Sequence, residues 1–316
     1  MSRNRTPLDL FCKKWYTCYR RLINLNQKIK NHCLAFFTIF IWGITFISTK
    51  HLEKSFSALE ILFVRYIIAY IVCWIICPRP LKFTGLKSEA MLLAAAVSGS
   101  ALYQYLENLS VSYTNPASVS FITAATPIFM AVLAHRFLGE KVTVRNIIGM
   151  FISIIGIFFI CFGDSKSLET GLLGDLIIFG IIWLWAVYSI LVKKISALGF
   201  EQFQVTRRLF MYSVILMIPF MAFKPSHMDF SALSDPYFLM NFAFLGIFAS
   251  ALCFSTWNIS VATLGATTTS KYLFIMPLIT LIAQSIYDKS GIGIAALVGM
   301  FITLGGIGFS EFGKKP

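Results

Sequence analysis

Two ionisable side chains interrupt long apolar stretches of this 316-residue chain. Arg65 lies within LEILFVRYIIAY, and Glu107 begins the ENLSV stretch at the end of another apolar run. A charge in such surroundings is costly, so it normally faces a partner or a water-filled cavity. A structural salt bridge between the two residues is the simpler interpretation. The alternative is a gating or proton-coupling role for Glu107.

Lys271 is a third charge of this kind, within TTTSKYLFIMPL. It follows the start of its apolar segment by only a few residues, or roughly 7 Å at 1.5 Å per residue. Its long stem can carry the ammonium back to the membrane interface, and we favour that interpretation. If Lys271 faces a cavity instead, it would prefer an anionic or carboxylate-bearing solute.

The remaining residue types argue against an enzyme. The chain has no H-E-x-x-H pair, no paired aspartates within an apolar segment and no glycine-rich phosphate loop. Its seven cysteines are scattered without a C-x-x-C pair, so we expect no disulfide framework, metal site or cofactor. All four histidines fall at segment ends or in loops: His32, His51, His135 and His227.

The composition indicates an all-α, polytopic membrane protein. Hydrophobic residues make up 57% and charged residues 13%, with a mean hydropathy of +0.76; soluble proteins have about a quarter charged residues. A spanning helix needs roughly 20 mostly apolar residues. Ten segments qualify: 32–49, 58–77, 89–110, 116–135, 143–162, 172–192, 203–222, 237–257, 266–287 and 292–311.

The basic residues predict which way the chain faces. Of its 27 lysines and arginines, 20 fall in the tails and loops on one side and 5 on the other. This bias predicts that both termini are cytoplasmic, in the inner membrane of a bacterium. The net charge of +13 then reflects topology, so no nucleic-acid partner is expected.

The segment 1–31 is basic and carries apolar residues at alternating spacings of three and four. That pattern suits an amphipathic helix on an anionic inner leaflet. A disordered tail that only enforces the topology is the alternative.

The chain also repeats itself. ENLSV at 107–111 matches WNISV at 257–261, and GMFISIIGI at 149–157 matches GMFITLGGI at 299–307, both at an offset of 150. A second register aligns IWGITFISTK at 41–50 with LWAVYSILVK at 184–193. We therefore predict two repeats, 32–163 and 171–312. Each repeat has five helices. Because five is an odd number, the second repeat enters the membrane from the opposite side and is inverted relative to the first. Inverted repeats are common in secondary transporters.

Such repeats predict a central substrate cavity near the membrane midplane. We expect polar and aromatic residues in matching or adjacent positions to line it: Trp42, Tyr103, Asn108, Trp185, Tyr188, Trp257, Asn258 and, less favoured, Lys271. Pro127 and Pro277 occupy equivalent mid-helix positions, where each produces either a static kink or a moving hinge. Gly139 is expected to end one helix and Thr143 to begin the next, with Glu140 supporting that turn beside Arg136 and Arg145.

Several stretches together resemble the EamA family of the drug/metabolite transporter superfamily: WGITF, ENLSVSYTNPASVSFITAATPIFMAVLAHRFLGEKVT, GMFISIIGI, WAVYSILVKK and WNISVATLGATTTSKYLFIMPLIT. The resemblance spans about 31–312. It implies ten helices, cytoplasmic termini and a carrier for small metabolites, often amino acids and often outward. It also implies a cavity formed by helices 1, 3, 4, 6, 8 and 9. One departure is that the Gly139-Glu140 pair has no counterpart after the ninth segment, where YDKSGIG stands.

The expected function is a secondary carrier that exports an amino acid or related small polar metabolite by alternating access. A flippase for a small lipid-linked precursor is an alternative, and a wide lateral opening would favour it. A non-transporting scaffold or sensor is another, and a cavity filled with side chains would favour that. The chain has no nucleotide motif for ATP coupling, and a monomer is compatible with the pattern.

Overall fold

The computed structural model describes residues 27–83, 85–114, 116–162, 171–223, 235–287, 289 and 291–311. All regular structure in these ranges is helical. The predicted amphipathic helix within 1–31 lies almost wholly outside them.

The first half of the chain forms five membrane-length segments, of which one contains a π-helix and one is broken by a turn. They are α2 (Gln27–Leu52), α3 (Ala58–Ile76), α4 with η1 and α5 (Leu86–Ala95, Ala96–Ala101, Leu102–Tyr113), α6 with α7 (Pro116–Thr123, Thr126–Leu138) and α8 (Val144–Phe162). The local sequence explains several of their ends. Ser57 and Glu60 form a capping box at the start of α3, and Gly139 ends α7 in the left-handed conformation at φ 67°.

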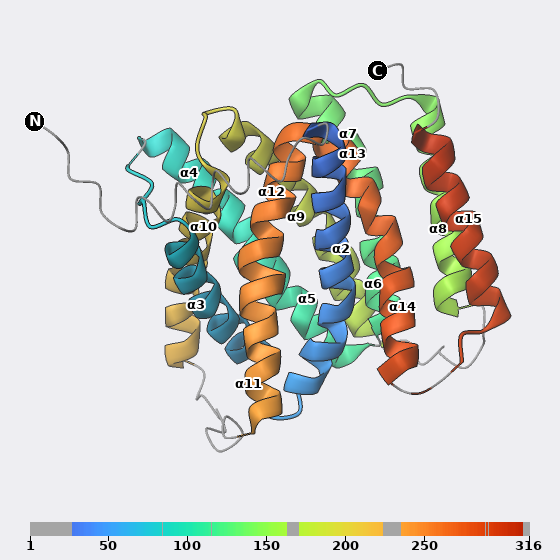
Figure 1. The fold of residues 1–316 in the computed structure, drawn as a ribbon, viewed down its shortest axis with the longest axis horizontal. Helices are drawn as coiled ribbons and strands as arrows, with labels where there is room; N and C mark the ends of the chain where they lie inside the picture. The colour runs from blue at the N-terminus through green and yellow to red at the C-terminus, as the bar shows by residue number, and fades with distance from the viewer. Residues whose placement is uncertain are drawn as a thin grey trace, which may run out of the picture.

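The second half forms five segments in the same order. They are α9 (Leu172–Ser196), α10 (Gln202–Phe223), α11 with η4 and α12 (Pro236–Ala243, Phe244–Leu252, Cys253–Leu264), α13 with η5 and α14 (Ala266–Ser270, Lys271–Ile275, Met276–Tyr287) and α15 (Ile294–Glu311). The predicted ten helices are confirmed (Figure 1).

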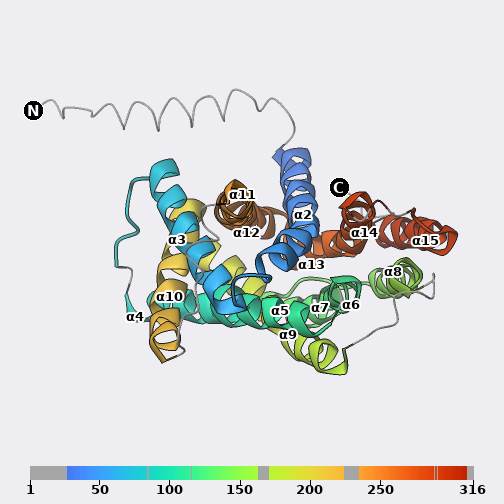
Figure 2. The same cartoon turned by 90° about the horizontal axis from the view of Figure 1, so that it is seen from below.

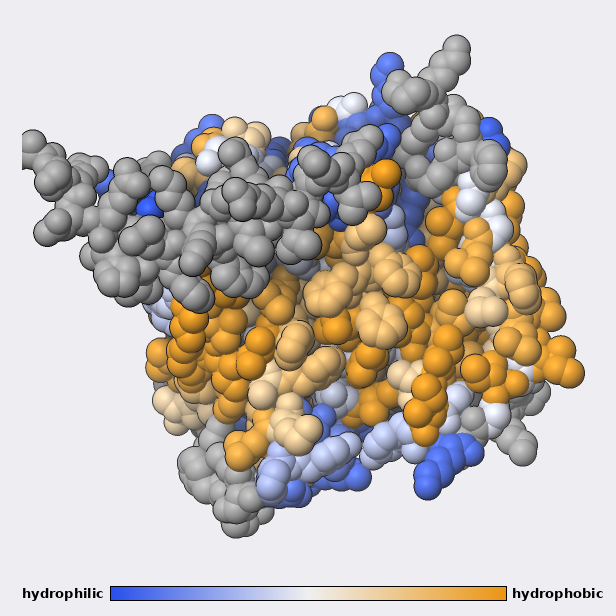
Figure 3. All heavy atoms as spheres, viewed as in Figure 1, coloured by the Kyte–Doolittle hydropathy of each residue, from blue (hydrophilic) through white to orange (hydrophobic). Residues whose placement is uncertain are grey.

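The helices form a polytopic membrane protein. Seven of the segments are long and apolar enough to cross a membrane, and parts of α8 and α15 add two shorter apolar helices. The segment Leu86–Tyr113 belongs to neither group, because it carries Gln104, Glu107 and Asn108. Figure 3 shows an apolar band around the middle of the molecule with polar residues above and below it.

The two halves are inverted relative to each other, and their packing is symmetric. α12 packs on α2 as α5 packs on α9, and α14 packs on α2 as α7 packs on α9. Lysines at matching positions make matching contacts: Lys50 Nζ donates to the Val111 carbonyl over 3.3 Å, and Lys193 Nζ donates to the Ala262 carbonyl over 2.5 Å. Each lysine satisfies a carbonyl in the last turn of a helix, where no intrahelical donor remains.

α8 and α15 form a pair at one edge of the molecule (Figure 2). Their backbones approach closely because glycines face each other. A methyl group added at Gly299 would lie 2.4 Å from the Gly156 carbonyl oxygen, and one added at Gly149 would lie 2.6 Å from that of Gly306. Small residues thus permit the contact, as in other membrane helix pairs.

Glu140 does not support the turn beside Arg136 and Arg145, as the sequence suggested. Its carboxylate instead accepts hydrogen bonds from the backbone amides of Ala266 and Thr267, over 2.8 and 3.0 Å. These amides begin α13 and have no intrahelical acceptor. A side chain from the fourth segment therefore caps the ninth, and the cap joins the two halves.

Gly299→Ala should destabilise the protein by about 1–3 kcal/mol, because the added methyl group overlaps backbone of the facing helix. Gly305→Ala is the matched control in the same helix, since a methyl group there meets nothing within 4 Å. Thermal unfolding of the purified protein in detergent measures both. Equal melting temperatures for the two variants would contradict the close contact.

Glu140→Ala should also destabilise, by about 1–3 kcal/mol, because two helix-end amides lose their acceptor. Glu140→Gln keeps one acceptor oxygen, so its melting temperature should fall between wild type and Glu140→Ala. If Glu140→Ala melts like wild type, the cap contributes nothing to stability.

Candidate functional site

A polar cavity of about 30 Å³ lies between the two halves. That volume holds about two water molecules, since each needs roughly 10–15 Å³ measured this way. Helices from both repeats contribute its walls. The lining residues are Trp42, Thr45, Phe46, Thr49, Arg65, Tyr103, Gln104, Glu107, Asn108, Thr123, Trp185, Leu273 and Met276.

Arg65 and Glu107 both line this cavity, but they do not form the expected salt bridge. Arg65 is 3% exposed and donates from Nε to Ser250 Oγ over 2.9 Å. Glu107 accepts from the Tyr103 hydroxyl on Oε1 and from Gln104 Nε2 on Oε2, each over 3.0 Å. Each charge is thus held by neutral groups, and the two attract each other without direct contact.

Two further donors at the cavity have no partner among the described residues. Asn108 Nδ2 and Trp185 Nε1 are buried without a hydrogen bond, and both side chains line the cavity. A buried donor left unpaired costs about 1–3 kcal/mol. Such groups in a cavity wall suit a polar solute or ordered water.

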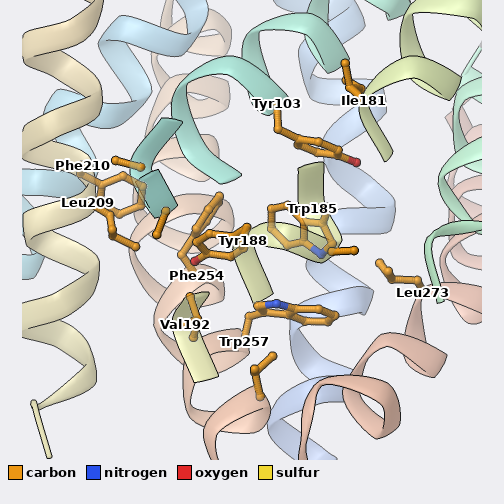
Figure 4. Packing of buried hydrophobic residues seen from close by; sticks show 14 of the residues in the cluster. Tyr103, Ile181, Trp185, Tyr188, Val192, Leu209, Phe210, Phe254, Trp257 and Leu273 are labelled. Atoms are coloured by element: carbon orange, nitrogen blue, oxygen red, sulfur yellow. The ribbon is translucent and has the colours of Figure 1, made fainter. Parts of the chain in front are cut away.

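Aromatic rings form a cluster on one side of the cavity. Trp42, Trp185 and Trp257 contact one another with ring centroids 5.3 to 5.8 Å apart. Figure 4 shows Tyr103, Trp185, Tyr188 and Trp257 close together in this cluster. The rings come from α2, α5, α9 and α12, so both halves supply them.

Tyr188, Trp257 and Asn258 were expected in the lining but are not among the residues around the cavity. All three are fully buried. The Tyr188 hydroxyl donates to Asn258 Oδ1 over 2.7 Å, and Asn258 Nδ2 donates to Thr206 Oγ1 over 3.1 Å. Asn258 therefore stabilises helix packing, whereas its repeat equivalent Asn108 faces the cavity.

Lys271 is also outside the cavity lining. It is only 2% exposed, so the protein covers its side chain, and the favoured snorkelling to the interface does not occur. Lys271 begins η5, a short 3₁₀ stretch, and Leu273 of that stretch lines the cavity.

Pro127 and Pro277 lie where their helices are interrupted. Pro127 is the second residue of α7, after the break that separates α7 from α6. Pro277 is the second residue of α14, directly after η5. Proline is tolerated there because its missing N–H would have no intrahelical acceptor. Both prolines thus accompany a helix interruption, and Thr123 and Met276 beside them line the cavity.

The third and eighth segments each contain a π-helix, η1 and η4, which the sequence reasoning missed. Such distortions often accompany functional sites. Their positions match across the repeat, because Ser100-Ala101-Leu102 and Ser250-Ala251-Leu252 stand 150 residues apart. That shared triplet is the signal that could have located them. Thr45 and Thr49 of the lining were missed as well.

The described residues contain no cluster of three or more potential metal ligands. The cavity instead combines one cation, one anion, amide and hydroxyl groups and indole rings. This set can bind a small charged or dipolar solute by hydrogen bonds and ion pairing.

This architecture matches that of known proteins. A family model described as the EamA-like transporter family matches residues 29–162 and again 172–311. A crystal structure superimposes with a TM-score of 0.73 at 13% identity, covering 89% of this chain and 96% of its own, which supports the fold alone.

Relatives similar in sequence are named as transporters. An uncharacterized transporter of Archaeoglobus fulgidus is 25% identical over 88% of this chain and 96% of its own length. The uncharacterized transporter YvbV of Bacillus subtilis is 24% identical over 87% and 89%. A protein of Streptantibioticus cattleyicolor named as a probable terminal-alkyne amino-acid exporter is 22% identical over 69% and 71%.

The family matches cover both halves of the chain, including every helix that lines the cavity. They identify a transporter rather than an enzyme. The chain belongs to the EamA-like transporter family.

Proposed function

We propose that the protein is a secondary transporter that moves a small polar metabolite by alternating access. The observation that supports this most is the buried polar cavity, walled by both halves and flanked by four helix discontinuities. Irregular backbone at membrane depth is tolerated where it is covered by protein or lines a cavity. In transporters built from inverted repeats, substrate sites lie at such interrupted helices.

The cavity is contracted in this conformation. Pockets that hold small molecules measure roughly 300–1,000 Å³, far more than the 30 Å³ here. Transport therefore requires the halves to separate on one side, which widens the cavity and admits the solute. The interruptions before Pro127 and Pro277 offer positions where the cavity-lining helices can bend.

The cavity also lies off-centre. It includes Trp42, Thr45 and Thr49 from the later half of α2, so it extends toward the end of the molecule where α2 finishes at Leu52. The first turn of α2 and the last turn of α15 lie together at the opposite end of the molecule (Figure 1). Lysine and arginine are in excess on the side of the chain that includes this end. That excess supports a cytoplasmic location for the end at which α2 begins, in a bacterial inner membrane.

Amino acids or related compounds are the proposed cargo, and export the proposed direction. Support comes from the Streptantibioticus relative, whose name describes an amino-acid exporter, and from the two opposite charges in the cavity wall. A contracted cavity would also suit a scaffold or sensor. The Asn108 and Trp185 donors support a carrier, because they lie in the cavity wall where a polar solute can satisfy them.

Flux of labelled polar metabolites into proteoliposomes, with and without a pH gradient, tests the proposal. We expect saturable, protein-dependent uptake of at least one small polar solute. Faster transport of a short-chain lipid analogue between leaflets would favour the flippase. If correctly folded protein moves no polar solute, the carrier function is excluded.

The repeat-related asparagines provide a matched comparison. Asn108→Ala removes a donor from the cavity wall, so flux should fall about tenfold or more while the melting temperature changes little. Asn258→Ala breaks the Tyr188–Asn258–Thr206 hydrogen bonds, so the melting temperature should fall by several degrees. Residual flux per folded molecule should then stay near wild type.

The reverse pattern, with Asn258→Ala abolishing flux and Asn108→Ala only lowering stability, would move the solute site to the Tyr188 region. Parallel flux and melting measurements on the two variants distinguish these outcomes.

A further inference from the structure

Arg65 and Glu107 do not pair with each other, although opposite charges near each other in a membrane protein normally do. Here both line one small cavity, yet each is anchored elsewhere. The side chains that hold them apart are Ser250 on one side, and Tyr103 and Gln104 on the other. The separation is therefore maintained by specific hydrogen bonds.

The anchoring leaves the binding surface of each charge available. Arg65 uses Nε for Ser250, and among the described residues no protein acceptor meets its two terminal nitrogens. Those two nitrogens form the edge of the guanidinium that grips a carboxylate with two parallel hydrogen bonds. Asn108 Nδ2 and Trp185 Nε1 add two unpaired donors to the same wall. This part of the cavity therefore presents several donors to a solute.

Glu107 supplies acceptors, the opposite of what Arg65 supplies. Each of its oxygens accepts one hydrogen bond from a neutral donor. A carboxylate can accept about four, so both oxygens keep capacity. The side chain is only half-buried, because part of its surface faces the cavity. An ammonium group would donate hydrogen bonds to the remaining acceptor positions of the Glu107 carboxylate and balance its charge.

We propose that Arg65 and Glu107 form a recognition site for a zwitterion, in which Arg65 binds the carboxylate and Glu107 the ammonium of an α-amino acid. This rests on the proposed transport function and names the solute class for the same cavity. A solute with one charge would leave one of the two side chains buried without a counter-charge, which is costly. A zwitterion compensates both and leaves the cavity neutral.

Steric fit also favours this arrangement. The carboxylate and ammonium of an α-amino acid are attached to one carbon, so they can reach counter-charges on α3 and α5 across a narrow space. The aromatic cluster beside the cavity, with Trp42 and Trp185, provides an apolar surface for the side chain of the solute. The contracted cavity must widen before it accepts one.

Competition in proteoliposomes tests the proposal. Uptake of a mixture of the twenty labelled amino acids identifies the best one. Its decarboxylated amine and its deaminated acid are then added as competitors. In wild type, the unlabelled amino acid should compete at least tenfold better than either analogue. Equal competition by the acid or the amine would overturn the zwitterion site.

Removing the charge of either Glu107 or Arg65 should change which analogue competes best with the amino acid. Glu107→Gln leaves Arg65 alone, so amino-acid uptake should fall roughly ten- to hundredfold while the acid becomes the better competitor. Arg65→Gln should do the opposite and favour the amine. Glu53→Gln and Arg136→Gln are the matched controls; Glu53 accepts from Ser112 outside the cavity, and Arg136 is exposed. Both should retain wild-type preference.

Arg65→Gln removes a buried charge and can impair folding. Arg65→Lys keeps the charge but loses the two-pronged geometry, so it should fold and bind the amino acid less tightly with the order of competitors unchanged. Ligand-dependent thermal stabilisation in detergent gives a second readout that needs no flux. Unchanged preference in Glu107→Gln by both readouts would overturn the proposal.

Failure of this inference differs from failure of transport. If wild type carries labelled sugars, nucleosides or amines but no amino acid, the zwitterion site is wrong and the carrier function stands. If no solute of any class is carried, the carrier function itself fails.

Discussion

The central constraint on this molecule is that backbone N–H and C=O groups inside a membrane must find partners within the protein. The structure interrupts its helices at four places and supplies donors for the groups set free. Trp42 Nε1 donates to the Ala249 carbonyl of η4 over 2.9 Å, and the Tyr66 hydroxyl donates to the Ser100 carbonyl of η1 over 2.7 Å. Thr126 Oγ1 donates to the Thr123 carbonyl at the break between α6 and α7 over 2.5 Å. The interruptions therefore persist only where side chains converge.

This convergence explains why the cavity lies where it does. An uninterrupted helix presents no spare backbone groups and packs most closely, as α8 and α15 do through their glycines at the edge of the fold. The interrupted third, fourth, eighth and ninth segments cannot pack in that way, so the space among them is filled by large rings and a few polar groups. Arg65 illustrates the link, because Ser250 of a π-helix holds its guanidinium.

The repeat, the ten helices and the general location of the site followed from patterns that survive in a single sequence. Apolar length predicts spans, and Pro127 and Pro277 at equal offset predict breaks. The π-helices did not follow, because one extra residue per turn leaves composition unchanged. Asn108 and Asn258 are the same residue type in equivalent positions, yet one faces the cavity and the other is fully bonded to Tyr188 and Thr206. Partners so distant in sequence cannot be inferred from local pattern.

The cap formed by Glu140 has a consequence for the energy of the conformational cycle. It joins the halves at one end through two bonds to a charged acceptor, which together contribute about 1–3 kcal/mol. The repeat cannot copy it at the other end, because Ser290 replaces Glu140 and Pro116, which has no N–H, replaces Ala266. Opening at this end therefore breaks two bonds that the repeat does not duplicate at the other. Such an unmatched pair biases how long each access state lasts, while the solute gradients alone determine the direction of net flow.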